Sequence, residues 1–338
     1  MKGLYKKIGA TIVGAIATVN VMALDELNVA YFEEWPMPFE YAKQIGAYEE
    51  ALGIPINWSA FGSGVAMSDA MGSGSIDISV SQGVPPFIVA VSTDQEFQIL
   101  DVAVSYADND NCVVASALEI DASNASELSG LKVSVPIGTA AHYGYLKQMD
   151  HFGVDVSSMD VVNMNPPEGA AAFAQGSVDM FCGWGGSLRR ALEHGNVLLT
   201  GDEKTALGIL VWDVTSSPTS FANENEEVIA TFLAVTAASN AMWNSGGFTS
   251  MMLPHIARDA GMDEAATLDT MNTFTFPSVS NQLSSAWLGG AGITFLKGVA
   301  DVFVDAGGIS GAKGSYAGNV NTDGLRSVAS ELNTKYRT

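Results

Sequence analysis

Apolar and polar positions follow two different periods along the first third of the chain, and this predicts strands that are each followed by a helix. Segments typical of strands have alternating apolar residues or many β-branched ones. These segments are residues 27–31, 54–61, 75–80 and 97–106. Helical spacing occurs over 39–52 and 65–72, and we expect Ser81-Gln82-Gly83 to open a further helix near Pro85-Pro86. The alternation predicts an α/β fold with a largely parallel sheet.

The same alternation continues beyond a polar break at 107–111, which reads ADNDN. The further strands that it predicts are residues 112–118, 131–135, 160–163, 178–182, 197–200 and 209–214. The helices predicted between them begin near Ala140, Glu168 and Ser187. The remainder of the chain is mostly helical in its spacing, most clearly over 226–244 and 264–271.

The polar break at 107–111 and a second polar stretch around 208–223 are interpreted as crossings between two domains. The chain is long enough to bury two cores. We therefore expect a discontinuous first lobe, 24–106 and 206–338, and a second lobe, 107–205, inserted in it. The two crossings would then act as a hinge.

The segment Leu131–Tyr145, with the sequence LKVSVPIGTAAHYGY, shows a strand, a turn and a helix start most clearly. Pro136 and Gly138 interrupt the strand pattern, and Thr139 occupies the position of an N-cap. One interpretation is an ordinary strand-to-helix turn. The other is an anion site, because a helix start presents unpaired N–H groups and a positive dipole end. Ligands of open α/β sheets bind beyond the carboxyl ends of the strands, where this turn would lie.

Residues 1–23 have the pattern of a secretory signal peptide, which is removed from the mature protein. The first seven residues include three lysines, residues 8–21 form an apolar run too short to span a bilayer, and Val21-Met22-Ala23 is typical of a cleavage site. No Cys lies near that site, which argues against a lipid anchor. We expect a mature chain that begins near Leu24 and is exported to the periplasm as a soluble monomer, without membrane insertion.

The charge of the chain is strongly acidic and excludes some partners. It has 37 acidic and 15 basic residues and a net charge of −22, and removal of the leader's lysines would make it more negative. Such a surface repels nucleic acid and anionic lipid. It also repels a small anion, so an anionic group of a ligand would need local hydrogen-bond donors.

Residue types with catalytic or redox chemistry are sparse. The two cysteines, Cys112 and Cys182, can form a disulfide in an oxidising compartment, and two separate buried thiols are the simpler expectation. Neither a GxSxG nor an HExxH motif occurs, and the four His residues have no metal-ligand spacing. We expect no catalytic residues, no metal and no cofactor.

Eight short segments spread over the chain carry a resemblance to a known family. They are Phe61-Gly62-Ser63-Gly64 with Gly72-Ser73-Gly74, Ser81 to Pro86, Val133 to Tyr143, Val161 to Pro167, Val178 to Trp184, Trp212-Asp213 and Asn272-Thr273-Phe274. The chain resembles the periplasmic taurine-binding proteins of ABC importers, within the wider group that binds aliphatic sulfonates. The resemblance implies a type II periplasmic binding fold, in which two α/β lobes joined by a two-stranded hinge close on one small zwitterion. It also implies delivery to a membrane permease and its ATPase.

The candidate ligand-binding residues come from the resemblance and from the residues themselves. The family pattern places an acid at Asp213 as the partner of the ligand's ammonium, and Trp184 matches an aromatic position. Helix starts offer N–H groups and hydroxyls for a sulfonate. The candidates at these starts are Gly62, Ser63, Ser81, Gln82, Thr139, Ala140 and His142.

The loop after the first strand adds Glu33, Glu34 and Trp35, of which at most one of the two acids should face the ligand. This loop is more acidic and aromatic than the family pattern, and aromatic faces bind methylated ammonium groups. Another small ammonium zwitterion, or another aliphatic sulfonate, is therefore the alternative to taurine.

Several candidates also have purely structural interpretations. Trp35 and Trp184 can be core packing, Asp213 can cap the hinge, and His142 can pack against the strand or cap its helix. A further alternative is an enzyme of related fold that makes the thiamine pyrimidine, which depends on a His and a Cys-rich motif. Cys182 alone does not supply that motif.

Overall fold

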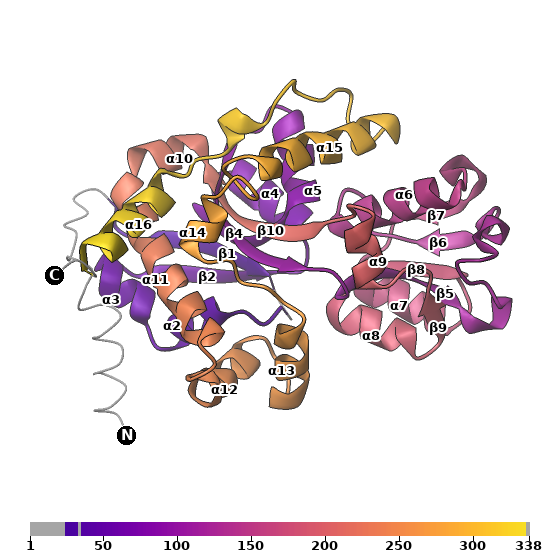
Figure 1. The fold of residues 1–338 in the computed structure, drawn as a ribbon, viewed down its shortest axis with the longest axis horizontal. Helices are drawn as coiled ribbons and strands as arrows, with labels where there is room; N and C mark the ends of the chain where they lie inside the picture. Colours follow the sequence, from indigo (N-terminus) through magenta and orange to yellow (C-terminus); the bar gives the residue numbers. More distant parts are fainter. Residues whose placement is uncertain (1–23, 33–34, 336–338) are drawn as a thin grey trace.

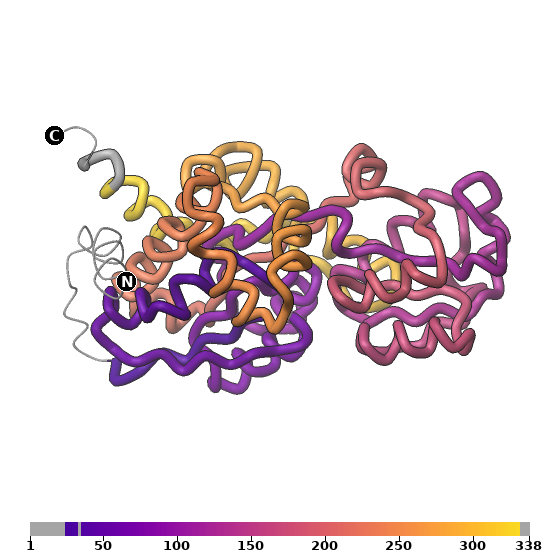
Figure 2. The backbone as a smooth tube through the Cα atoms, turned by 90° about the horizontal axis from the view of Figure 1, so that it is seen from below, coloured from indigo at the N-terminus to yellow at the C-terminus, as the bar shows by residue number. Residues whose placement is uncertain are grey.

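Two five-stranded sheets form the centres of two lobes that lie along the longest axis of the molecule (Figures 1 and 2). The computed structural model describes residues 24–32 and 35–335. In the first sheet the order is β2-β1-β3-β10-β4, and in the second it is β7-β6-β8-β5-β9. The strands of the first are β1 (Leu27–Phe32), β2 (Ile56–Phe61), β3 (Ile78–Gly83), β4 (Phe97–Tyr106) and β10 (Val211–Pro218). Those of the second are β5 (Asp110–Ala115), β6 (Lys132–Ser134), β7 (Asp160–Val162), β8 (Met180–Trp184) and β9 (Gly195–Val197).

Both sheets are mixed, because one strand in each runs against the other four; the expectation of a largely parallel sheet holds for those four strands but missed the reversed one. In the first, β1 is parallel to β2 and β3, whereas β10 is antiparallel to β3 and β4. The second repeats this pattern, with β6 parallel to β7 and β8, and β5 antiparallel to β8 and β9. The antiparallel strands β10 and β5 are the ones by which the chain enters each sheet after crossing from the other lobe. Because each of these strands enters its sheet from the other lobe, it runs antiparallel to its neighbours. The alternation of strands and helices in the sequence does not reveal this direction.

Helices cover both faces of each sheet (Figure 1). In the first lobe, α11 packs against α2, α3 and α16, and α15 packs against α5. The helices around the first sheet are α2 (Pro38–Gln44), α3 (Ala47–Leu52), α4 (Gly64–Gly72), α5 (Val84–Ser92), α10 (Thr219–Glu224), α11 (Glu226–Asn244), α12 (Thr249–Asp259), α13 (Glu264–Asn272), α14 (Val279–Gln282), α15 (Ala291–Asp305) and α16 (Asp323–Lys335). Those around the second are α6 (Ala140–Phe152), α7 (Pro166–Ala174), α8 (Gly185–Leu192) and α9 (Gly201–Ala206). None of the helices in the described ranges is long and apolar enough to cross a membrane.

Three predicted elements differ from the observed ones for local reasons. The helix expected over 39–52 is divided into α2 and α3, because Gly46 adopts a positive φ of 73° and interrupts the helical hydrogen bonds. Ser81-Gln82-Gly83 does not open a helix but ends β3, and α5 begins at Val84. The strand expected over 112–118 ends at Ala115 and continues as a single 3₁₀ turn.

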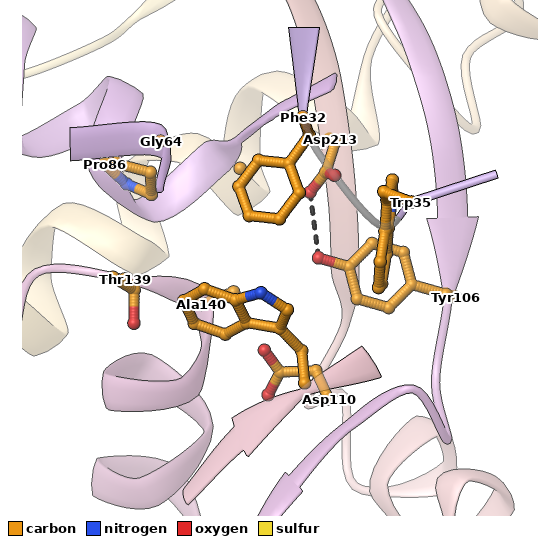
Figure 3. Close-up of a pocket in the computed structure, with 11 residues that line it drawn as sticks. Phe32, Trp35, Gly64, Pro86, Tyr106, Asp110, Thr139, Ala140 and Asp213 are labelled. Atoms are coloured by element: carbon orange, nitrogen blue, oxygen red, sulfur yellow. Dashed lines mark hydrogen bonds between the residues drawn. The ribbon is translucent and has the colours of Figure 1, made fainter. Parts of the chain in front are cut away.

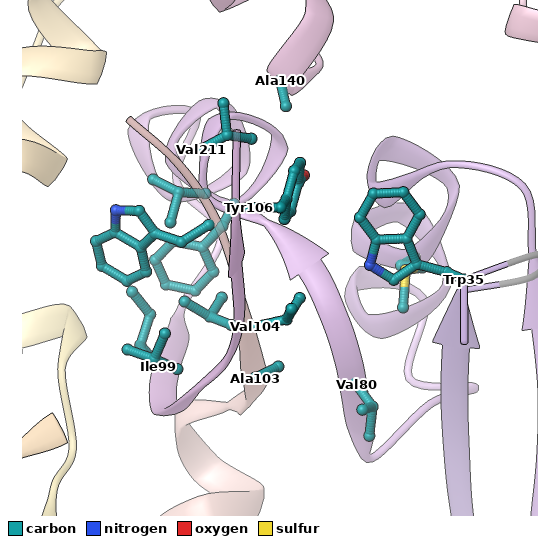
Figure 4. Close-up of a cluster of buried hydrophobic side chains, with 14 of the residues drawn as sticks. Trp35, Val80, Ile99, Ala103, Val104, Tyr106, Ala140 and Val211 are labelled. Carbon is teal, nitrogen blue, oxygen red and sulfur yellow. The ribbon is translucent and has the colours of Figure 1, made fainter. Parts of the chain in front are cut away.

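Apolar side chains of the first sheet continue toward the second lobe. Figure 4 shows Val104 and Tyr106 of β4 close to Val211 of β10, with Ile99 farther along β4 and Ala140 of α6 on the side of Tyr106. On the other side of this contact, Phe303 of α15 lies 5.5 Å from the His142 ring of α6, measured between ring centroids. The two lobes therefore touch through α6 as well as through the connecting strands.

The two cysteines form a disulfide, so the expectation of two separate buried thiols is wrong. Cys112 of β5 and Cys182 of β8 are opposite each other in an antiparallel pair, and their sulfurs are bonded. The bond closes a loop of 70 residues, and cross-links of this span stabilise a fold by about 4 kcal/mol, chiefly by restricting the unfolded chain. It fixes the central strand of the second sheet, β8, to its neighbour β5.

Candidate functional site

A pocket lies between the two lobes and is lined by residues of both (Figure 3). The space between its lining atoms, including its opening to solvent, is about 310 Å³. The first lobe contributes Phe32, Trp35, Gly64, Gly83, Pro86, Tyr106 and Asp213. The second lobe contributes Asp110, Thr139, Ala140 and Trp184. Among these lining residues two are acidic and none is Lys or Arg.

The topology explains why these residues converge. Phe32, Gly83 and Trp184 are the last residues of β1, β3 and β8, and ligands of α/β sheets bind beyond such strand ends. Tyr106 ends β4 and Asp110 begins β5, so they flank one crossing between the lobes. Asp213 lies near the start of β10, directly after the other crossing. The pocket is therefore built where the chain passes between the lobes.

Asp213 is buried and oriented by two hydroxyl groups. The Ser81 hydroxyl donates to its Oδ2 at 2.7 Å, and the Tyr106 hydroxyl donates to its Oδ1 at 2.9 Å. The side chain is only 4% exposed. Burial raises the pKa of Asp213 to about 7, against the lowering effect of the two hydroxyls. The group is a carboxylate poor in water, held in one orientation, and a cation at this place would favour its ionised form.

Ser81 holds its position at a cost in backbone conformation. Its φ is +63°, in the left-handed region that residues other than glycine rarely adopt. The pairing of β10 with β3 loses its regular register beside it. Such strain is of order 1–3 kcal/mol and persists where the surrounding structure requires it. Here it accompanies the placement of the Ser81 hydroxyl on Asp213.

Asp110 is a second buried acid in the pocket, and the sequence analysis did not identify it. Its side chain is 2% exposed, and its Oδ2 has no hydrogen-bond partner among the described residues. Burial raises the pKa of Asp110 to about 7, with the cation of Lys204 acting in the opposite direction. The sequence places Asp110 only in the polar break between the lobes, and its pairing with Trp184 across β5 and β8 is visible only in the structure.

Four aromatic side chains form the walls of the pocket. Trp35 packs at 4.8 Å from the ring of Tyr106, and Phe32 lies 5.9 Å from Trp184 of the opposite lobe. Burial raises the pKa of Tyr106 well above its usual value, with Asp213 and Asp110 adding to the effect. Tyr106 therefore stays a neutral hydroxyl donor. Aromatic faces beside carboxylates are a favourable surrounding for an ammonium group.

Helix starts from both lobes reach the same pocket. Thr139 is the N-cap of α6, and its hydroxyl accepts from the His142 N–H at 3.4 Å. Gly64 begins α4 close to Pro86 of α5, and a Cβ atom at Gly64 would lie 2.6 Å from the Pro86 Cγ. The first N–H groups of a helix have no acceptor within it. The starts of α4 and α6 can thus present N–H donors to an anionic group without a basic side chain.

Comparison with known proteins agrees with this architecture. The model of the NMT1/THI5-like family matches residues 36–243, which is more than half of the chain. The chain belongs to the NMT1/THI5-like family. It is 24% identical over 222 residues to the taurine-binding periplasmic protein of Escherichia coli, a match that covers 66% of this chain and 68% of that one.

Two solved structures show the same fold as this member of the NMT1/THI5-like family. The periplasmic aliphatic sulphonate-binding protein of Escherichia coli superposes with a TM-score of 0.69 at 20% identity, over 86% of this chain and 90% of that one. The periplasmic nitrate-binding protein of Synechocystis gives a TM-score of 0.70 at 12% identity, over 92% and 89%. The fold is accordingly the type II periplasmic binding fold, as the sequence resemblance implied.

The structure brings some of the candidate residues to the pocket of this NMT1/THI5-like protein and directs others elsewhere. Those that line it are Trp35, Thr139, Ala140, Trp184 and Asp213. Ser81 lies behind Asp213, and the Ser63 hydroxyl is used to cap α4 by accepting from the Ala66 N–H. Gly62 lies at a second hollow, which Phe32 and Trp184 also line. Glu33 and Glu34 lie outside the described residues.

Gln82 and His142 point away from the pocket into local hydrogen-bond networks. The Gln82 amide donates to the Gly64 carbonyl at 3.2 Å and accepts from the Ser216 hydroxyl at 2.6 Å, so it fixes α4 to β10. The His142 Nδ1 accepts from the Gly138 N–H at 3.2 Å. Burial lowers the pKa of His142 to about 4, which keeps it neutral at pH 7. It therefore stabilises the turn before α6.

The described residues offer no alternative metal chemistry. Within the described ranges, no group of three or more His, Cys, Asp or Glu side chains is placed to hold a metal ion. The site's chemistry is that of two carboxylates, aromatic faces, hydroxyls and helix N–H groups. This combination can bind a small molecule that carries a cation and an anion.

Proposed function

We propose that the protein is the substrate-binding component of an ABC importer, which captures taurine in the periplasm and delivers it to a membrane permease and its ATPase. The observation that carries the proposal is the buried, hydroxyl-oriented carboxylate of Asp213 in the same pocket as the starts of α4 and α6. Taurine is a small zwitterion with an ammonium at one end and a sulfonate at the other. The pocket offers a complement for each end.

The helix starts are the proposed site of the sulfonate. Its three oxygens accept several hydrogen bonds, and Gly64 and Ala140, which begin α4 and α6, line the pocket from different lobes. Because the chain has a net charge of −22 and no Lys or Arg lines the pocket, the anion depends on these donors and on the helix dipoles. Charge-assisted hydrogen bonds of this kind are roughly twice as strong as neutral ones.

The carboxylate of Asp213 is the proposed partner of the ammonium, with Trp35 and Trp184 as walls. A micromolar or tighter dissociation constant is expected, which corresponds to about 8 kcal/mol or more. The taurine-binding and sulphonate-binding names of the relatives support a ligand of this class. Both names also contain the word periplasmic, which supports the proposed location. The proposed signal peptide, residues 1–23, lies outside the described residues.

A methylated ammonium zwitterion is the second candidate ligand, and the four aromatic walls favour it. A catalytic role of the thiamine-pyrimidine type finds no support in the site. Both cysteines are joined in the disulfide, so neither provides a thiolate. We therefore propose a binding protein and not an enzyme.

Thermal melting with added ligand tests the proposal. A ligand that binds only the folded state raises the free energy of unfolding by about 4 kcal/mol at a concentration 1,000 times its Kd. Millimolar taurine should raise the melting temperature by several degrees and be recovered unchanged. Sodium sulfate at the same concentration serves as the control for ionic effects. A melting temperature that taurine does not raise above the sulfate control would contradict the proposed function.

A further inference from the structure

Asp110 has a carboxylate that the protein itself leaves incompletely paired. The side chain is buried in the pocket, and its Oδ2 has no partner among the described residues. Its Oδ1 faces the backbone of α6, 3.7 Å from the place where a Cβ of Gly144 would lie. A buried acceptor without a donor costs free energy that the fold must offset elsewhere. Such a group in a binding pocket indicates that a ligand supplies the missing donor.

The nearest buried cation does not satisfy this carboxylate. The Lys204 Nζ donates to the backbone carbonyl of Ala107 at 2.8 Å and to the backbone carbonyl of Asp110. These bonds fix the crossing between β4 and β5 rather than pairing with the Asp110 side chain. The pocket therefore holds two carboxylates from opposite lobes, Asp213 with a hydroxyl on each oxygen and Asp110 with an oxygen still unpaired.

We infer that Asp110 is a specificity-determining residue, which accepts an N–H of the ligand's ammonium so that this group bridges Asp110 of the second lobe and Asp213 of the first. The inference rests on the proposed function and adds the class of ammonium that the site selects. A primary ammonium has three N–H donors and can serve both carboxylates. A trimethylated ammonium has no donor and would leave the Asp110 oxygen unpaired. The site therefore prefers a primary ammonium even though its aromatic walls suit either kind.

The bridging arrangement also explains why two buried acids are tolerated in one pocket. The charge of Asp110 adds to the cost of ionising Asp213, because a like charge disfavours the charged form. Burial raises the pKa of both, and Asp110 contributes to the rise at Asp213. A cation between them removes this repulsion. Ligand binding then draws the two lobes toward the same charge.

Calorimetric titration of Asp110→Asn tests the inference with taurine and N,N,N-trimethyltaurine as probes. Asn has nearly the same shape but lacks the charge. The wild type should bind taurine about 30-fold or more tightly than the trimethylated compound, and Asp110→Asn should lose about 10- to 100-fold in taurine affinity. The ratio between the two probes should shrink. Asp160→Asn makes the same change at an exposed aspartate of the second lobe and should leave both affinities unaltered.

A second readout separates this role from a structural one. The melting temperature of ligand-free Asp110→Asn at pH 8 should equal or exceed that of the wild type, because a buried charge beside Asp213 has been removed. A lowered melting temperature with an unchanged probe ratio would overturn the inference. So would a taurine affinity within about twofold of the wild type, while the proposed function would still stand. If the wild type binds neither probe, the proposed function itself fails.

Discussion

At the scale of single residues, the pocket depends on how the buried acids are held. Asp213 accepts one hydroxyl on each oxygen, from Ser81 and Tyr106. These neutral donors orient the carboxylate without cancelling its charge. A salt bridge to Lys or Arg would have oriented the carboxylate and also neutralised its charge. No unpaired negative charge would then remain for a ligand cation. Asp213 is thus an oriented anion in the pocket, and a cation that pairs with it has to come from the ligand.

The raised pKa values predict opposite pH dependences for stability and for binding. Burial raises the pKa of both Asp110 and Asp213 to about 7, so the native state binds more protons than the unfolded state between about pH 4 and 7. The ligand-free protein should therefore lose stability as the pH rises through this window. Its melting temperature should be higher at pH 5 than at pH 8.

Taurine affinity should change in the other direction, because the ammonium binds the ionised carboxylates. The titratable groups that face the two acids are Tyr106, which stays neutral, and Lys204, whose pKa burial lowers. Taurine keeps both of its charges between pH 5 and 8. Calorimetry should show binding at least about tenfold weaker at pH 5 than at pH 8. An affinity that is constant over this range would contradict the assignment of the acids to the ammonium.

The sequence analysis reached some of these residues and missed others for a physical reason. Thr139 was identified because it stands at a helix start that the local pattern marks, whereas Asp213 and Trp184 were identified through the resemblance to the family. Asp110 and Tyr106 were missed because their importance depends on pairing across the second sheet and between the lobes. Burial of an acid is a tertiary property that the sequence around residue 110, a run of polar residues, does not indicate.

At the scale of elements, the close approach of two helix starts shapes the first-lobe side of the pocket. α4 and α5 converge at Gly64 and Pro86, where there is no room for a Cβ. The Gln82 amide joins the Gly64 carbonyl to β10 through Ser216. The first turn of α4 is therefore fixed by packing and by hydrogen bonds, so its N–H groups are already oriented before a ligand arrives.

Gly64→Ala should disturb this arrangement. The new Cβ would lie 2.6 Å from the Pro86 Cγ, and overpacking of this kind costs about 1–3 kcal/mol. We expect a lower melting temperature and a taurine affinity reduced about tenfold, measured by melting and calorimetry. Gly298→Ala in α15 is the matched control, because no atom lies within 4 Å of its added Cβ. If Gly64→Ala binds taurine as the control does, the start of α4 has no part in the site.

Element prediction succeeded where the pattern is local and strong. The strand over 97–106 and the helix over 226–244 coincide with β4 and α11. It failed at Ser81-Gln82-Gly83, where a glycine and two prolines suggested a helix start although the residues continue β3. Backbone pairing of Gln82 and Gly83 with β10 decides the matter there, and that pairing is not visible in the chain order.

At the scale of the whole molecule, the pocket lies where the lobes are joined. Tyr106 and Asp110 flank one crossing and Asp213 follows the other, so relative movement of the lobes would change the distance between the two acids. The Cys112–Cys182 bond joins β5 and β8 two residues from Asp110 and Trp184, respectively. The second lobe thus carries its pocket residues on a cross-linked pair of strands, and it can move as a unit.

The central claim is that a buried acid in this pocket recognises the ammonium of a small sulfonate, and calorimetric titration of Asp213→Asn tests it most directly. Loss of one partner of a desolvated charge pair costs about 3–5 kcal/mol, so taurine should bind about a hundred- to thousandfold more weakly than to the wild type. Ethanesulfonate lacks the ammonium, so the wild type should bind it far more weakly than it binds taurine. Asp213→Asn should bind ethanesulfonate at least as tightly as the wild type does. A variant that binds taurine as tightly as the wild type does would contradict the account. So would a wild type that binds ethanesulfonate as tightly as taurine.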